Sequence, residues 1–252
     1  MHQVDIKEDN RLETFITRRY ESTLSVMNER DVELMRSLMD SIGDTVNGGV
    51  VLIDVSSTQF VRVNLVLLKG LLEELDHTGI FISVDRPHQY MVHLMRMHKI
   101  CLDRITFIDV ISRFSADRKA GEARVSFVDG PFHIDALPHA MEEWSMNGRS
   151  KINDMDELGF TMIDNIAALQ MYNRNPAVEL FINNFILMAK SQGNVLVPLV
   201  LDRERHRSLY DSAMRFCDKE VKVERDLSSA TNGSRSEIRK EISSINYNKE
   251  AR

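Results

Sequence analysis

Two aspartates come directly after short apolar runs and are the first candidates for chemistry. Asp85 follows the run from Ile80 to Val84, and Asp164 ends the run that begins at Gly159. Such short apolar runs predict parallel strands that are buried on both faces, and ligands in α/β proteins bind at the carboxyl ends of these strands. Asp164 could therefore organise a magnesium ion. It could equally cap the loop that follows, and the stretch alone leaves both interpretations open.

A polar turn is the second candidate. Ser56, Ser57, Thr58 and Gln59 separate an apolar strand-like run from a helical pattern, and Arg62 follows them. A helix amino terminus preceded by such residues attracts anions through its free N–H groups and its dipole. Arg62 could contact a phosphate as a cation. The alternative is a plain polar turn with an exposed arginine.

The pattern around these candidates alternates strands with helices. β-branched or otherwise apolar runs predict strands at 50–55, 80–84, 105–110, 124–128, 159–164, 195–201 and 220–223. Apolar residues at three- and four-residue steps between most of these runs predict helices. Alternation of this kind specifies an α/β fold with a mostly parallel sheet flanked by helices. Pro198 lies within one run and suggests a bulge or a position near the sheet edge.

The domain organisation follows from changes in this pattern. Residues 1–46 carry helical periodicity, and a new helix start near Asp31 predicts two helices rather than one rod. Residues 47–224 form the predicted α/β domain. Residues 225–252 are rich in Ser, Asn, Glu and Lys, which predicts a polar tail that lacks a packed core.

The composition narrows the class of protein. The 252 residues have a formal net charge of -6, which argues against a dedicated nucleic-acid binder. The two cysteines are far apart in sequence and have no His or Cys at metal spacing, so neither a disulfide framework nor a zinc site is indicated. The polar amino terminus lacks the apolar core of a signal peptide, and no run is long enough to span a membrane. We therefore expect a cytoplasmic protein.

The order of these segments resembles the RecA/KaiC superfamily of ATPases, in particular its archaeal KaiC-like branch. Gly79 to Arg86 is similar to the strand whose end carries the catalytic acid in that superfamily, which would make Asp85 the residue that polarises the attacking water. Gly159 to Tyr172 resembles the Walker B strand with its Ile-Asp-Ser continuation, with Asn165 in place of Ser. The resemblance covers roughly residues 47–223 and implies that Asp164 holds magnesium.

The phosphate-binding loop departs from the family pattern. A working loop reads G-x-x-x-x-G-K-[ST], because glycines let backbone N–H groups approach the phosphates, the lysine neutralises them and the hydroxyl binds magnesium. Alignment with the family places Ser56 and Val61 at the glycines, Arg62 at the lysine and Val63 at the hydroxyl position. None of the four residues is kept. Asp85 is also one methylene shorter than the usual glutamate.

The resemblance and the degenerate loop together predict a KaiC-like protein that has lost hydrolysis and has a regulatory, signalling or scaffolding role. It would act through protein contacts, as an oligomer or with a partner of unknown identity. Residual ATP binding would involve Ser56 to Gln59 and Arg62. The alternative is a divergent magnesium-dependent ATPase that uses Arg62, Asp85 and Asp164.

Two other clusters favour a structural interpretation. His88, His93 and His98 step by five residues, which rotates each by about 140° from the last around a helix and does not favour a metal site. A second cluster could supply an arginine finger or bind an anion, although its mixed signs favour a solvated turn. It consists of Arg203, Arg205 and Arg207, with Asp202 and Glu204 between them.

Overall fold

The computed structural model describes residues 27–112, 123–128, 130, 134, 158–191 and 193–223. The described residues contain a seven-stranded sheet in which every strand pairing is parallel. The predicted α/β fold with helices beside a parallel sheet is therefore confirmed. The strands are β1 (Gly49–Asp54), β2 (Thr78–Ser83), β3 (Ile105–Asp109), β4 (Arg124–Phe127), β5 (Leu158–Asp164), β6 (Leu196–Leu201) and β7 (Lys219–Lys222).

The strand order is β4-β3-β2-β5-β6-β1-β7. In this order β1 and β2 are separated by two strands, β5 and β6, which come later in the chain. From β2 the chain continues to one edge of the sheet through β3 and β4, and then returns to form β5 and β6 between β2 and β1. Consecutive parallel strands are joined through helices, so this reversal puts the connecting helices on opposite faces of the sheet. The loops that follow β1, β2, β5 and β6 consequently meet at the point where the direction of winding changes.

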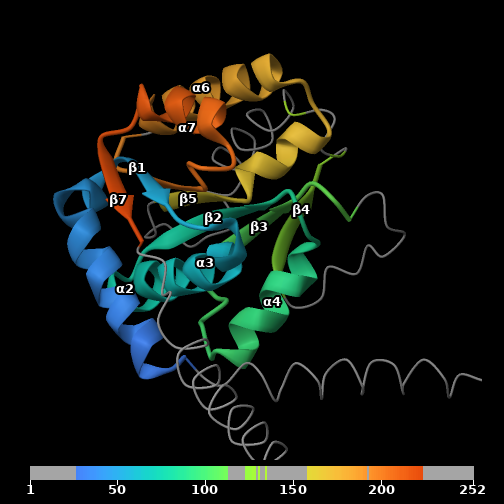
Figure 1. The fold of residues 1–252 in the computed structure, drawn as a ribbon. Helices are drawn as coiled ribbons and strands as arrows, with labels where there is room; N and C mark the ends of the chain where they lie inside the picture. Colours follow the sequence, from blue (N-terminus) through green and yellow to red (C-terminus); the bar gives the residue numbers. More distant parts are fainter. Residues whose placement is uncertain are drawn as a thin grey trace, which may run out of the picture. The chain divides into compact units, whose positions relative to one another are not determined.

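Helices cover both faces of the sheet (Figure 1). One face carries α2, α3 and α4, and the other carries α6 and α7. Short 3-10 segments connect several elements, and a π-helical turn extends α3. The helices are α2 (Glu29–Ile42), α3 (Phe60–Lys69), α4 (His88–Met97), α6 (Asn175–Ser191) and α7 (Arg207–Met214). The short segments are η1 (Gly43–Asn47), η2 (Ser57–Gln59), η3 (Gly70–Glu74) and η4 (Ile166–Met171).

The start of α2 lies where the sequence predicted a new helix. The Asn28 side chain accepts a hydrogen bond from the backbone N–H of Asp31, and the Asp31 side chain accepts one from the N–H of Asn28. This capping box satisfies amide groups that an open helix end leaves without partners. The predicted helix before Asn28 and the polar tail at 225–252 lie outside the described residues, and so does the helix that the apolar periodicity predicts from Ile134 to Ser145, apart from Ile134 itself.

The central strands carry the core because both of their faces are covered. All six residues of β2 and of β6 are buried, as are five of β3. The expectation that Pro198 lies near the sheet edge is wrong, since β6 lies between β5 and β1. Its ladder to β1 runs the full strand length, whereas it pairs with β5 at a single position, where Leu196 lies opposite Phe160. The missing N–H of Pro198 is tolerated because this second ladder is short.

Candidate functional site

A polar cleft lies at the point where the winding of the sheet reverses. Its volume is about 240 Å³, and its walls come from the residues that follow β1, β2, β5 and β6. In α/β folds ligands bind at this place, because loops on both sides of the reversal diverge and leave a crevice. The lining residues are Ser57, Phe60, Val61, Asp85, Arg86, Asp164, Asn165, Ala167, Ala168, Met171, Arg205 and His206.

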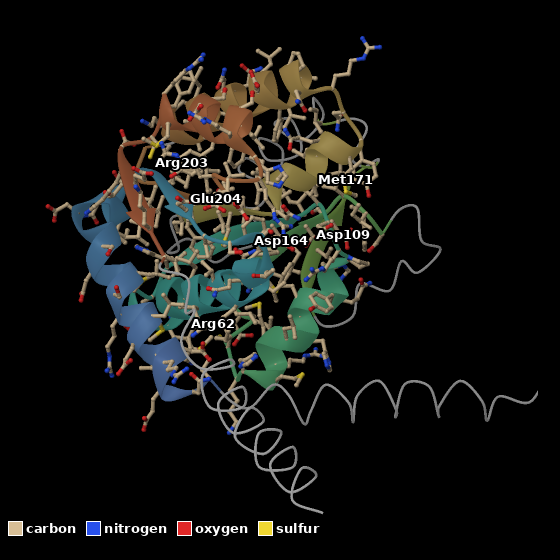
Figure 2. The ribbon with its side chains drawn as sticks, in the orientation of Figure 1. Arg62, Asp109, Asp164, Met171, Arg203 and Glu204 are labelled. Carbon is tan, nitrogen blue, oxygen red and sulfur yellow. The ribbon has the colours of Figure 1, made fainter. Side chains whose placement is uncertain are left out.

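Asp164 ends β5 at the base of the cleft (Figure 2). Its side chain accepts a hydrogen bond of 2.6 Å from the amide Nδ2 of Asn64, which belongs to α3. Both residues are buried, and the Asn64 Oδ1 atom has no hydrogen-bond partner among the described residues. The carboxylate therefore faces the neutral amide of Asn64, which follows Val63, the residue that the family alignment places at the magnesium-binding hydroxyl position.

The surroundings of Asp164 disfavour its charged form. Burial raises its pKa to about 6, and the nearby Asp85 acts in the same direction. Arg86 and the Asn64 hydrogen bond oppose this shift without cancelling it. A buried acid with a raised pKa beside a cleft is a frequent feature of functional sites, although structural networks also produce it.

Asp85 and Asn165 connect the loops after β2 and β5. The Asn165 amide Nδ2 donates to Asp85 Oδ2 at 3.2 Å, and Asn165 adopts a left-handed backbone conformation with φ 58°. Asparagine tolerates that conformation better than most residues with a Cβ atom. Arg86 lies 3.7 Å from Asp85 Oδ2 through its Nε atom and stacks over the Tyr90 ring. Asp85 thus lies in the cleft wall but is already engaged by an amide and a guanidinium group.

The polar turn after β1 is closed by contacts within the protein. Ser57 to Gln59 form the 3-10 segment η2, and the Gln59 N–H donates to the Ser56 carbonyl oxygen at 2.8 Å. The Ser57 N–H donates to Asp202 Oδ2, also at 2.8 Å. Helix α3 then begins at Phe60, a buried residue of the cleft wall.

Asp202 is the carboxylate that holds this turn. It follows β6, is 2% exposed, and also accepts hydrogen bonds from the backbone N–H groups of Glu204 and Arg205. Burial works against its charge, but these hydrogen bonds and the one from Ser57 prevail and lower its pKa. The Asp202 carboxylate therefore accepts the hydrogen bond of the Ser57 N–H, at the turn where the resemblance would place a phosphate.

Arg62 lies away from the cleft. Its Nε atom contacts Asp31 Oδ1 of α2 at 2.6 Å, and it lines a separate cavity of about 350 Å³ among α2, α3 and α4. Figure 2 shows Arg62 on the α2 side of α3 and Asp164 on the sheet side. Residues two apart on a helix differ by about 200° in direction, so a helix that aims Asn64 at Asp164 aims Arg62 toward α2. Among the predicted phosphate-binding residues, Thr58 also lines this second cavity.

Sequence reasoning missed Asn64 and His206 as parts of the site. Asn64 is the one neutral polar residue within the apolar helix Phe60–Lys69, and that contrast was an available signal. His206 lies in the cleft wall, and its Nδ1 atom is 2.9 Å from Gln170 Oε1 of η4. Nothing in the local sequence signals the contact between Ser57 and Asp202, because the two residues are 145 positions apart.

The three histidines of the α4 region have different surroundings. His88 and His98 are buried, whereas His93 is exposed. The His88 Nδ1 atom contacts Asp109 Oδ2 at 2.6 Å, at the carboxyl end of β3. Within the described ranges, no group of three or more His, Cys, Asp or Glu side chains could hold a metal ion. In the same ranges, no helix is both long enough and apolar enough to cross a membrane.

Comparison with known proteins supports the fold. Neither a protein-family model nor a curated protein sequence matches the chain. The structure is similar to that of uncharacterized protein PH0321 from Pyrococcus horikoshii in complex with an unknown peptide, at a TM-score of 0.54 and 13% identity, over 79% of this chain and 85% of that one. A second solved structure, that of an ATPase domain, has a TM-score of 0.49 and 13% identity, over 92% of this chain and 88% of that one. Identities this low describe a shared fold and do not transfer an activity.

Proposed function

We propose that this protein is a catalytically degenerate KaiC-like member of the RecA superfamily, with a regulatory or scaffolding role exercised through protein contacts. The observation that carries the proposal is the closed turn between β1 and α3. A phosphate-binding loop needs free N–H groups and an open arc of backbone. Here the Ser57 N–H already donates a hydrogen bond to the Asp202 carboxylate. The backbone of Ser57–Gln59 forms the 3-10 segment η2 instead of an open loop.

The charges at the turn support the same conclusion. The resemblance implies a lysine beside the phosphates, but Arg62 forms an ion pair with Asp31 on the other side of α3. The Asp202 carboxylate is negative at neutral pH, because its pKa is lowered. A triphosphate at this turn would meet a buried negative charge and would have to displace the Asp202 carboxylate from the Ser57 N–H.

The donor groups around Asp164 do not fit magnesium. This ion prefers several oxygen ligands in octahedral geometry. Asn64 contacts Asp164 through its amide N–H, which donates a hydrogen bond and cannot ligate a metal ion. Asp85 is likewise engaged by the amide of Asn165.

A divergent magnesium-dependent ATPase remains the second candidate, and one observation favours it. The pKa of Asp164 is raised to about 6, which means that the fold holds a carboxylate in surroundings that penalise its charge. Buried acids with a raised pKa are frequent at functional sites, although structural networks also produce them. On this alternative Asp85 and Asp164 would act on nucleotide in the cleft.

Two measurements on the purified protein separate the two candidates. The first is calorimetric titration with ATP and with ADP in the presence of magnesium, and the second is an assay of phosphate release. The degenerate protein should give no saturable heat and no phosphate above the background. Saturable binding in the micromolar range together with phosphate release, both of which Asp164→Ala abolishes and Asp40→Ala leaves intact, would overturn the proposal. Asp40 suits the control because it is an exposed aspartate on α2. Binding without phosphate release would keep the loss of hydrolysis and make nucleotide a sensed ligand.

A further inference from the structure

The second cavity, among α2, α3 and α4, has a largely apolar wall. Its volume of about 350 Å³ lies in the range of small-molecule sites, which are mostly apolar with a few polar groups. Two residues of the wall, Asn28 and Thr58, are exposed, so the cavity reaches the protein surface and a ligand can enter it. The apolar and aromatic residues of the wall are Met27, Val61, Leu65, Val66, Tyr90 and Leu94.

The wall also contains a buried histidine whose ring nitrogens are unpaired. His98 follows the last residue of α4 and is 7% exposed. Within the described part of the chain, neither of its ring nitrogens has a hydrogen-bond partner. Leaving buried polar atoms unpaired is unfavourable. Because each side of an imidazole ring carries one nitrogen, a small rotation of the ring can offer one to a molecule in the cavity.

The charged groups of the wall favour a neutral ligand. Asp31 and Arg62 both line the cavity and form an ion pair with each other at 2.6 Å. Burial lowers the pKa of His98, and Lys69 acts in the same direction against Asp31, so the imidazole is neutral at pH 7. A neutral imidazole has one N–H donor and one acceptor nitrogen. A hydroxyl group matches it, because a hydroxyl both donates and accepts, whereas a carboxylate only accepts and an ammonium group only donates.

The volume of the cavity sets the size of the ligand. An apolar protein cavity of about 150 Å³ binds benzene, so a cavity of about 350 Å³ has room for roughly two fused rings. We propose that this cavity binds a small neutral aromatic alcohol, whose rings contact the apolar wall and whose hydroxyl group pairs with His98. The apolar contacts supply most of the affinity, and the hydrogen bond supplies the selectivity. This site does not depend on whether the cleft binds nucleotide.

Equilibrium dialysis of the full chain at pH 7 tests the role of His98. The two probes are naphthol and methylnaphthalene, substituted at the same ring position, so that they differ in the hydroxyl group. We expect naphthol to bind saturably. Its affinity relative to that of methylnaphthalene should fall about tenfold in His98→Leu, because one hydrogen bond is lost. His93→Leu, at an exposed position of the same helix, should leave this ratio unchanged. A chain that does not bind naphthol, or a ratio that His98→Leu leaves unchanged, would overturn the proposal.

Filling the cavity tests where the probes bind. Leu65 is buried in the wall, and Leu65→Trp should weaken the binding of both probes at least tenfold, because the larger side chain takes up their space. Leu180→Trp is the matched control, since this leucine of α6 is 60% exposed and lies outside the cavity. Binding that Leu65→Trp leaves intact would overturn the proposal by placing the probes elsewhere. The ratio measured in His98→Leu decides the proposal even where Leu65→Trp does not fold, and neither measurement involves nucleotide.

Discussion

Two buried aspartates end parallel strands on either side of β2, and their surroundings are opposite. Asp109 ends β3 and accepts hydrogen bonds from the N–H and Nδ1 of His88, from the N–H of Ile111 and from the N–H and Oγ of Ser112. Asp164 ends β5 and accepts one hydrogen bond from the described residues, which Asn64 donates. Burial alone would raise both pKa values. The donors overcome it at Asp109, where the pKa falls to about 2, but not at Asp164, where it rises to about 6.

This difference separates a structural carboxylate from a candidate functional one. Asp109 accepts hydrogen bonds from the start of α4 and from the loop after β3, and so links these two segments. Five donors stabilise its charged form although the side chain is buried. Asp164 lines the cleft and has few donors, so the fold keeps it at a cost. The same residue type at the same place in a strand thus has two different electrostatic environments, and the number of hydrogen-bond donors distinguishes them.

The largest expected effect is at Asp109. Asp109→Ala removes the acceptor of five hydrogen bonds and leaves buried donors without partners, so we expect the free energy of unfolding to fall by about 3–5 kcal/mol. Urea unfolding followed by circular dichroism measures the change. Asp103→Ala is the control, because Asp103 is exposed and follows α4 rather than a strand. A loss at Asp109 no larger than that of the control would contradict its structural role.

The opposite sign is expected at Asp164. An asparagine there still accepts the Asn64 N–H but carries no charge that burial penalises. The difference between the usual pKa of 3.8 and about 6 sets an upper limit of about 3 kcal/mol, so Asp164→Asn should stabilise the protein by about 1–3 kcal/mol at pH 7. The measurement is again urea unfolding. Destabilisation would mean that the charged carboxylate is better satisfied than its contacts indicate.

The sequence predicted most of the strands and helices, because β-branched runs and apolar residues at three- and four-residue steps are local signals. The order of the strands was not, since the return of the chain to place β5 and β6 between β2 and β1 depends on long-range packing. Pro198 shows the limit: the local rule predicted an edge, but a short ladder to β5 accommodates it inside the sheet.

The site was readable only in part. The approximate location of Asp85 and Asp164 followed from their position after strand-like runs. The direction of Arg62 did not, because it depends on where α3 begins and on the partner that α2 offers. The carboxylate that closes the turn at Ser57 comes from Asp202, and a contact between residues so distant in sequence leaves no local pattern.

The pH dependence separates the two aspartates further. The folded pKa of Asp164 lies above its unfolded value, so the folded state binds more protons and its stability falls as the pH rises from about 4 to 6. The folded pKa of Asp109 lies below its unfolded value, so its contribution is complete above about 4 and is lost as the pH falls through 2. The advantage of Asp164→Asn should therefore grow by about 2 kcal/mol between pH 4 and 6 and then level off. An advantage that stays constant across that range would show that Asp164 has an ordinary pKa.

The smallest expected effect concerns a single donor to Asp109. Ser112→Ala removes the Oγ donor, whose hydrogen bond to Asp109 Oδ2 is 2.6 Å long, and leaves the four other donors in place. We expect a loss of about 1 kcal/mol and a modest rise in the pKa of Asp109, measured by urea unfolding and by NMR titration of the carboxyl carbon. If the number of hydrogen-bond donors sets the pKa values of the two aspartates, removing one of the five donors should raise the pKa of Asp109 only slightly toward that of Asp164. A loss as large as that of Asp109→Ala would instead mean that the Ser112 hydroxyl alone maintains the charge, and that the number of donors is not what separates the two sites.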